Sequence, residues 1–174
     1  MIRIFIFPLI LLVMFSSCKE EQKVEDSTEK LTTTYYFIRH AEKDRSDPSD
    51  KNPHLTEIGN SRAAHWSEIL GNVKFDAIYS TDFNRTKETA QPTATKNNLV
   101  ITLYDPNQIE AKSFLAETSG KTVLIVGHSN TTPAFVNKIL GHKKYDDIDD
   151  SNNGNLYIVT VAGTLITDQF LTIN

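Results

Sequence analysis

Hydrophobic and polar residues follow two different periods along the chain. Short runs rich in Ile, Val, Phe and Tyr, bounded by Gly, Pro or Asp, predict strands. Longer runs with apolar residues three and four positions apart predict helices. In the run from Thr56 to Leu70 this spacing predicts one buried face, made of Ile58, Ala63, Trp66, Ile69 and Leu70. The two kinds of run alternate along the chain, which is typical of an α/β domain.

The order of these runs predicts the architecture. The expected strands are Thr33–Ile38, Phe75–Ser80, Val100–Tyr104, Thr122–Val126, Leu156–Val161 and Leu165–Ile173. The expected helices are Thr56–Leu70, Asp82–Asn97, Gln108–Thr118 and Thr132–Leu140. Strands alternating with helices predict a three-layer α/β/α fold with a mostly parallel sheet. The last two strands follow each other directly as a hairpin, so the sheet should be mixed. Thr122–Val126 is continuously apolar and should be the central strand, covered on both faces.

Capping and breaking residues predict the helix ends. Asp82 could cap the second helix, and Pro92 should kink or split it. Thr132 and Pro133 should be the N-cap and the first helical residue of the fourth helix, and Gly141 should end it.

The first 31 residues do not fit the domain pattern. Residues 1–17 carry one positive charge and then an apolar run too short to span a bilayer comfortably, which indicates a secretory signal peptide. The run ends in Phe-Ser-Ser-Cys, which resembles a bacterial lipoprotein signal and implies lipid attachment at Cys18. Residues 18–31 are charged and should form a disordered linker, and residues 32–174 should form the domain. We therefore expect a lipid-anchored protein of the bacterial cell envelope.

Composition excludes some classes of partner. The 174 residues carry a formal net charge of −4, so bulk charge gives no case for nucleic-acid binding. The chain has a single cysteine and therefore forms neither an intramolecular disulfide nor a thiolate metal cluster. No spacing of the histidines indicates a metal site, and the sequence predicts no cofactor.

Charged residues gather where the predicted strands end. Arg39 and His40 end the first strand, Arg85 lies one turn into the helix after the second, and Asp105 follows the third. The central strand ends in Gly-His-Ser-Asn, which contains His128 and Asn130. In an open α/β sheet, ligands bind beyond the carboxyl ends of the strands. Guanidinium groups bind phosphate in bidentate fashion, and a neutral histidine can attack phosphorus. This pattern predicts a phosphate site with a nucleophile.

The stretch FIRHAEK, from Phe37 to Lys43, resembles the Arg-His-Gly motif of the histidine phosphatase superfamily, which has the phosphoglycerate-mutase-like fold. Ala41 stands where glycine is usual. The stretch TDFNRTKETA, from Thr81 to Ala90, resembles the family segment that supplies a second arginine, with Asp82 in place of proline. The resemblance covers the chain from Tyr35 to the C-terminus.

The resemblance implies a role for each matching residue. It makes His40 the phosphorylated nucleophile, and Arg39, Arg85 and His128 the rest of the phosphate pocket. Asn130 could donate to a phosphate oxygen or could cap its helix. Asp105 is our choice for the general acid, with Glu110 and Glu42 as alternatives. Thr89 should pack or cap locally.

The predicted activity is metal-independent hydrolysis of a phosphomonoester or phosphoramidate through a phosphohistidine intermediate. The loops are short, as in compact phosphatases that act on phosphoproteins or on small exposed phosphoesters. Specificity should lie in the polar loops Asp44–His54 and Gly141–Asn153. A phosphoglycerate-type mutase and a non-catalytic lipoprotein that binds an anionic ligand are the alternatives.

Overall fold

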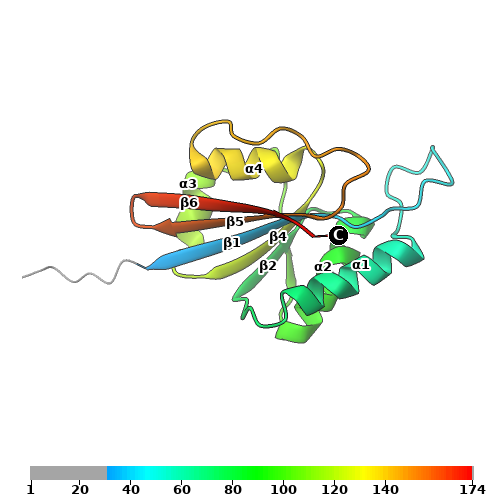
Figure 1. Cartoon of the computed structure of the whole chain (residues 1–174), viewed down its shortest axis with the longest axis horizontal. Helices are drawn as coiled ribbons and strands as arrows, with labels where there is room; N and C mark the ends of the chain where they lie inside the picture. Colours follow the sequence, from blue (N-terminus) through cyan, green and yellow to red (C-terminus); the bar gives the residue numbers. More distant parts are fainter. Residues whose placement is uncertain (1–30, 174) are drawn as a thin grey trace, which may run out of the picture.

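A computed structural model describes residues 31–173, and it forms a three-layer α/β/α domain (Figure 1). The strands are β1 (Thr32–Arg39), β2 (Ala77–Ser80), β3 (Ile101–Leu103), β4 (Thr122–Gly127), β5 (Asn155–Ala162) and β6 (Leu165–Thr172). The helices are α1 (Glu57–Ile69), α2 (Asn84–Asn97), α3 (Ala111–Glu117) and α4 (Thr131–Leu140). The predicted signal peptide and Cys18 lie outside the described residues.

The six strands form one mixed sheet in the order β3-β2-β4-β1-β5-β6. Three pairs of strands are parallel: β3 with β2, β2 with β4, and β4 with β1. By contrast, β5 pairs antiparallel with β1, and β6 pairs antiparallel with β5. β4 lies between β2 and β1 and is buried from Val123 to Gly127. The predictions of a mixed sheet and of a central apolar strand are therefore confirmed.

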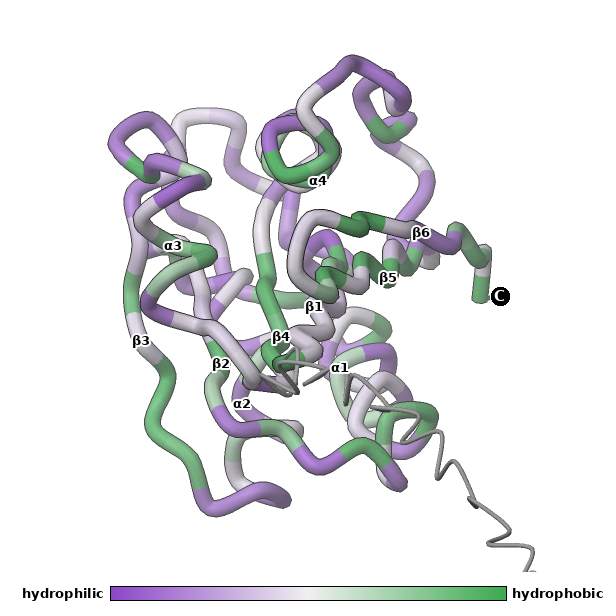
Figure 2. Tube along the Cα trace, turned by 90° about the vertical axis from the view of Figure 1, so that its left-hand side faces the viewer, coloured by the Kyte–Doolittle hydropathy of each residue, from purple (hydrophilic) through white to green (hydrophobic). Residues whose placement is uncertain are grey.

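Two hydrophobic cores cover the two faces of the sheet, because successive side chains of a strand point to opposite faces. Phe37 of β1 and Ile125 of β4 pack with Phe114 of α3 and Phe135 of α4 on one face. On the other face, the apolar residues of β1, β2, β4 and β5 pack with α1 and α2, and this core contains Ile38, Leu124, Trp66, Ile78 and Ala90. In Figure 2 the apolar side of α4 is turned toward the sheet and its polar side away from it.

Two of the predicted core positions of α1 are wrong. Ile58 and Ile69 are 68% and 37% exposed, whereas Ala63, Trp66 and Leu70 are buried. The helix lies across the sheet so that only the stripe through the latter residues faces the core. Apolar spacing alone does not show which of two adjacent stripes packs inward.

The ends of α2 and α4 differ from the predicted ones. Asp82 does not cap α2, which begins at Asn84 after Phe83; the Asp82 carboxylate instead pairs with Lys87. Pro92 lies within α2 without splitting it. Asn130, and not Thr132, is the N-cap of α4.

Pro133 is therefore the third residue of α4 instead of the first. The change is tolerated because none of the first N–H groups of a helix has an intrahelical acceptor. Gly141 ends α4 with φ 77°, as predicted from its freedom to adopt left-handed backbone angles.

Within residues 31–173, no helix has the length and apolar character needed to cross a membrane.

Candidate active site

His40 lies at the carboxyl end of β1, where the backbone leaves the sheet. Its N–H donates to Gly127 O of β4 at 2.9 Å, and its own carbonyl accepts from Asn153 Nδ2 at 2.8 Å. The residue is 4% exposed. The peptide that carries the imidazole is therefore fixed by two parts of the chain that are distant in sequence, β4 and the loop before β5.

The hydrogen bond of the His40 ring selects its tautomer. Nδ1 lies 2.7 Å from the carbonyl oxygen of Ala41, which can only accept, so Nδ1 carries the proton. Burial lowers the pKa of His40 from 6.5 to about 3, and the charge of Arg39 also lowers it. The ring is therefore neutral near pH 7, with the lone pair on Nε2.

The segment after His40 is anchored to α2 and α1. Ala41 N–H donates to Thr89 Oγ1 at 2.9 Å, and Thr89 Oγ1 donates to Arg85 O at 2.7 Å. Thr89 thus makes the local contact predicted for it. Thr56 N–H donates to Glu42 O at 2.9 Å, and a Cβ at Gly59 would come within 2.2 Å of that oxygen. The absence of a side chain at Gly59 lets α1 approach the nucleophile segment closely.

His128 and Arg85 lie beside His40. The two imidazole centroids are 5.4 Å apart, and Arg85 Nη2 lies 3.4 Å from His128 Nδ1. Because Arg85 can only donate, Nδ1 of His128 accepts and Nε2 donates to Thr81 Oγ1 at 2.9 Å. Burial lowers the pKa of His128 to about 4, with a further contribution from the Arg85 charge.

The sequence did not indicate that Thr81 belongs to the site. Its hydroxyl donates in turn to Thr86 Oγ1 at 3.0 Å, and Thr86 donates to the Thr81 and Phe83 carbonyls. This chain of hydroxyls orients the ring of His128. The threonines follow β2 and begin α2, but nothing in their spacing indicates which side chain they would bind.

The site contains buried guanidinium donors without acceptors. Among the described residues, Arg39 Nε, Arg85 Nε and Arg85 Nη1 are buried and have no hydrogen-bond partner. A buried N–H group without a partner is costly, and a charged one more so. The arrangement therefore provides a place for an anion, and the donors suit tetrahedral oxyanions such as phosphate.

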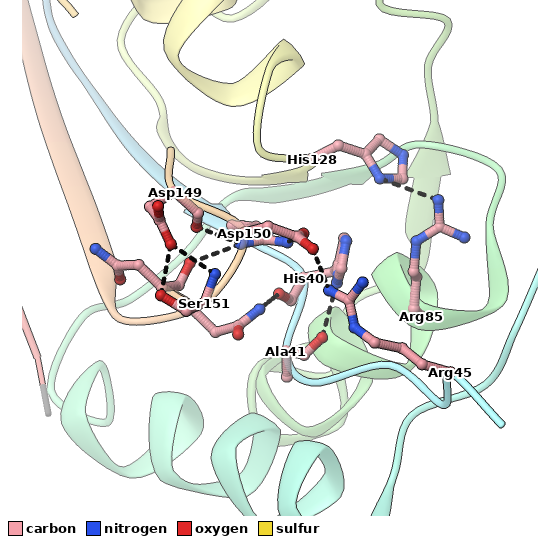
Figure 3. A network of polar contacts seen from close by, with 11 residues as sticks. His40, Ala41, Arg45, Arg85, His128, Asp149, Asp150 and Ser151 are labelled. Atoms are coloured by element: carbon pink, nitrogen blue, oxygen red, sulfur yellow. Dashed lines mark hydrogen bonds and ion pairs between the residues drawn. The ribbon is translucent and has the colours of Figure 1, made fainter. Parts of the chain in front are cut away.

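A cavity of about 200 Å³ contains the nucleophile and is lined by two loops. Its residues are His40, Glu42, Lys43, Arg45, Asp150, Ser151 and Asn153. Arg45 Nη2 and Asp150 Oδ2 form an ion pair of 2.8 Å that joins the loops. Figure 3 shows His40 between the Asp149–Ser151 turn and the His128–Arg85 pair. The loops expected to determine specificity therefore both reach the site.

Arg39 has partners that the sequence did not indicate. Its Nη1 donates to the carbonyls of Asp149 and Asn152, both at 2.9 Å, and its Nη2 donates to Asp150 Oδ1 at 2.7 Å.

The described part of the chain contains no group of three His, Cys, Asp or Glu side chains suited to hold a metal ion.

The candidates for the general acid lie in different places. Asp105 is exposed, and its Oδ1 accepts from Asn107 N–H within its own turn. Glu110 is exposed at the start of α3. Glu42 lines the His40 cavity, with Oε1 paired to Arg62 and Oε2 buried without a partner among residues 31–173. Only Glu42 of the three borders the nucleophile's cavity.

Asn130 acts as the cap of α4 through Oδ1, which accepts from Thr131 N–H at 2.9 Å. The capping alternative is therefore confirmed. Donation from its amide nitrogen to a phosphate oxygen stays a prediction.

Solved structures share this fold, and a known protein family matches the segment that contains His40. Residues 35–111 match the model of the histidine phosphatase superfamily (branch 1). No curated protein sequence matches the chain. The fold resembles the protein histidine phosphatase SixA complexed with tungstate, with a TM-score of 0.63 and 16% identity over 80% of this chain and 96% of that one.

Two further solved structures have similar folds. Phosphoglycerate mutase from Bacillus anthracis has a TM-score of 0.62 at 14% identity, covering 82% of this chain and 93% of that one. A phosphoserine phosphatase mutant from Entamoeba histolytica, in complex with phosphoserine, has a TM-score of 0.59 at 13% identity, covering 79% and 96%. At such identities the likeness concerns the fold.

Proposed function

We propose that the chain is a histidine phosphatase, as the match of residues 35–111 to that superfamily supports, and that it hydrolyses a phosphomonoester or a phosphoramidate through a phosphohistidine at His40. The observation that carries this proposal is the state of the His40 ring. Its Nδ1 donates a proton to Ala41 O, its pKa is lowered to about 3, and the residue lines a cavity. Among the described residues, donors of the nearby Arg39 and Arg85 have no hydrogen-bond partner. A neutral imidazole in a cationic pocket suits attack on an anionic phosphoryl group.

In the first step of the proposed reaction, the substrate phosphoryl group binds the free donors of Arg39 and Arg85. His40 Nε2 forms a bond to phosphorus while the bond from phosphorus to the leaving oxygen or nitrogen breaks. The leaving group takes a proton from a carboxylic acid. The arginines supply the positive charge that a metal ion provides in other phosphoryl-transfer sites.

In the second step, water attacks the phosphohistidine, the N–P bond breaks and inorganic phosphate leaves. The carboxylate that lost its proton in the first step recovers it from the attacking water. We propose Glu42 for this role, because an acid must reach the leaving group and Glu42 borders the cavity. Asp150 also borders it, but both of its carboxylate oxygens are paired with guanidinium groups, which lowers its pKa to about 2. Glu42 is paired through Oε1 alone, and its Oε2 has no partner among the described residues.

The small volume of the cavity supports a substrate whose phosphoryl group protrudes. About 200 Å³ holds a phosphoryl group and the atoms next to it, so the rest of the substrate stays outside. A phosphoprotein or a small exposed phosphoester fits this description. No observation favours the mutase alternative.

Steady-state hydrolysis of p-nitrophenyl phosphate by residues 32–174 tests the proposed activity. We expect His40→Ala to lower kcat/KM by at least ~10³-fold, since the nucleophile is lost. His65→Ala is the matched control, because this histidine is exposed on α1 and does not line the cavity, and the rate of this variant should equal that of the wild type. Equal rates for the His40 variant and the wild type would overturn the mechanism. A wild-type protein that does not hydrolyse the ester would overturn it as well.

We further propose that a lipid on Cys18 anchors the domain to a membrane of the bacterial cell envelope. The Phe-Ser-Ser-Cys sequence after an apolar run and the charged stretch before the domain support this. Labelling cells with a radioactive fatty acid should label the full-length protein, and Cys18→Ser should abolish the label. Equal labelling of the two proteins would contradict the anchor.

A further inference from the structure

One arginine of the proposed phosphate pocket is occupied by the protein's own anion. The Arg39 side chain is 2% exposed beneath the Asp149–Asn152 turn. Its Nη2 donates to the Asp150 carboxylate at 2.7 Å, and the other carboxylate oxygen accepts from Arg45 Nη2 at 2.8 Å. The Asp150 carboxylate therefore bridges two guanidinium groups at the cavity that holds His40.

The turn does not depend on this carboxylate for its shape. Asp149 Oδ1 accepts from Ser151 N–H at 2.9 Å, and the Asp149 and Asn152 carbonyls hold Arg39 Nη1. The Asp150 side chain is itself 68% exposed. The carboxylate can thus leave its position without breaking the other contacts of the turn or releasing Arg39.

A carboxylate and a phosphoryl group compete for the same kind of donor. Both accept two parallel N–H bonds from a guanidinium group. The other charged side chains that line the cavity are Lys43, Arg45 and Glu42, and the charge of Arg45 helps keep Asp150 ionised. An incoming phosphoryl dianion would meet this negative charge close to His40.

We propose that Asp150 is an affinity-determining residue that competes with the substrate phosphoryl group for Arg39 and Arg45. Substrate binding moves its carboxylate toward solvent, and the phosphoryl oxygens accept from Arg39 Nη2 and Arg45 Nη2 in its place. This inference rests on the proposed function for the identity of the ligand. It differs from a positioning role, in which Asp150 would orient Arg39 for the substrate and its loss would weaken binding.

The two roles predict effects of opposite sign on phosphate binding. Titration calorimetry with inorganic phosphate should show that Asp150→Asn binds roughly three- to tenfold tighter than the wild type, because a like charge near the ligand is removed at a partly exposed position. Asp146→Asn is the control: it removes the same charge from the same loop, where Asp146 pairs with exposed Lys143. Its affinity should stay within about twofold of the wild type.

Unchanged or weaker binding by Asp150→Asn would overturn the proposal, and so would an equal gain in both variants, which would show an effect of net charge alone. Asp150→Ala provides a second variant and should also bind more tightly; thermal unfolding verifies that each protein is folded.

The experiment measures binding and not turnover, so it separates this proposal from the proposed function. A protein that binds phosphate more tightly without Asp150 but hydrolyses no substrate would refute the phosphatase and leave the competition established.

Discussion

The protonation state of the nucleophile depends on a single hydrogen bond, which the residue types alone do not determine. Arg39, His40, Arg85 and His128 could be chosen from the sequence because each stands in a short motif at the end of a strand or the start of a helix. The tautomer of His40 could not, because it depends on the path by which the Ala41 carbonyl turns toward Nδ1. The structure thus supplies the protonation state that the motif leaves open.

Glu42 and Asp105 can be separated by isosteric substitutions. With a phosphate ester of an alkyl alcohol, Glu42→Gln should lower kcat by ~10²-fold or more, because a poor leaving group needs a proton in the transition state. The loss should be much smaller with p-nitrophenyl phosphate, whose leaving group is stable as an anion. Asp105→Asn should change neither rate, since its carboxylate binds within its own turn. The reverse result, with Asp105→Asn selective for the alkyl ester, would restore the choice made from the sequence.

The pairing of Arg45 with Asp150 shows why part of the site could not be predicted. Both residues stand in polar loops that lack periodicity, and their contact depends on how each loop leaves the sheet. The sequence predicted that these loops determine specificity. It contained no signal for which charges within them would meet.

Secondary-structure elements follow the predicted order, whereas their ends depend on competition between neighbouring polar residues. Asn130 and Thr132 are both good capping residues, and the Asn130 side chain accepts the Thr131 N–H while Thr132 lies buried within the first turn. Such choices are decided by packing of the helix on the sheet and not by capping preference alone.

Two buried threonines of α2 offer a matched test of how the nucleophile segment is held. Thr89 Oγ1 accepts the Ala41 N–H and donates to Arg85 O, whereas Thr93 Oγ1 is buried without a partner in the described structure. Thr89→Val should lower the free energy of unfolding by ~1–3 kcal/mol, because it leaves a buried N–H group unpaired. Thr93→Val should be neutral or stabilising. Urea denaturation measures both, and equal losses would show that packing, not the hydrogen bond, matters at these positions.

At the scale of the whole molecule, strand order converts distant motifs into one site. β1 and β4 are adjacent and parallel, so His40 and His128 leave the sheet at the same edge, and β2 next to β4 places the start of α2 beside them. The parallel strands and the terminal hairpin could be predicted from element order. The antiparallel placement of β5 beside β1, which puts the Asp149–Asn152 turn over Arg39, could not be chosen from the pattern alone.

Burial of the two histidines should make the stability of the fold depend on pH. The pKa of His40 is lowered to about 3 and that of His128 to about 4, from 6.5. As the pH falls below ~6.5, the unfolded chain takes up protons on these rings and the native state does not, so the free energy of unfolding should fall. The slope is at most ~1.4 kcal/mol per pH unit for each ring, and these rings contribute no slope above pH ~7.5.

Urea denaturation between pH 4.5 and 7.5 tests this dependence. His128→Gln should flatten the slope over this range, and exposed His65→Gln should leave it as in the wild type. The lowered pKa of Asp150, about 2, affects stability only at lower pH. An identical slope in the His128 variant would contradict the assignment of the effect to this ring.

Covalent trapping tests the central claim most directly. Rapid acid-free quenching of residues 32–174 during turnover of radiolabelled p-nitrophenyl phosphate should give a protein-bound phosphoryl group that is stable in alkali and lost in acid. Peptide mapping should place it on His40, and His40→Ala should carry none. Turnover by the wild type without label at His40, or the same label in the His40 variant, would contradict a phosphohistidine mechanism.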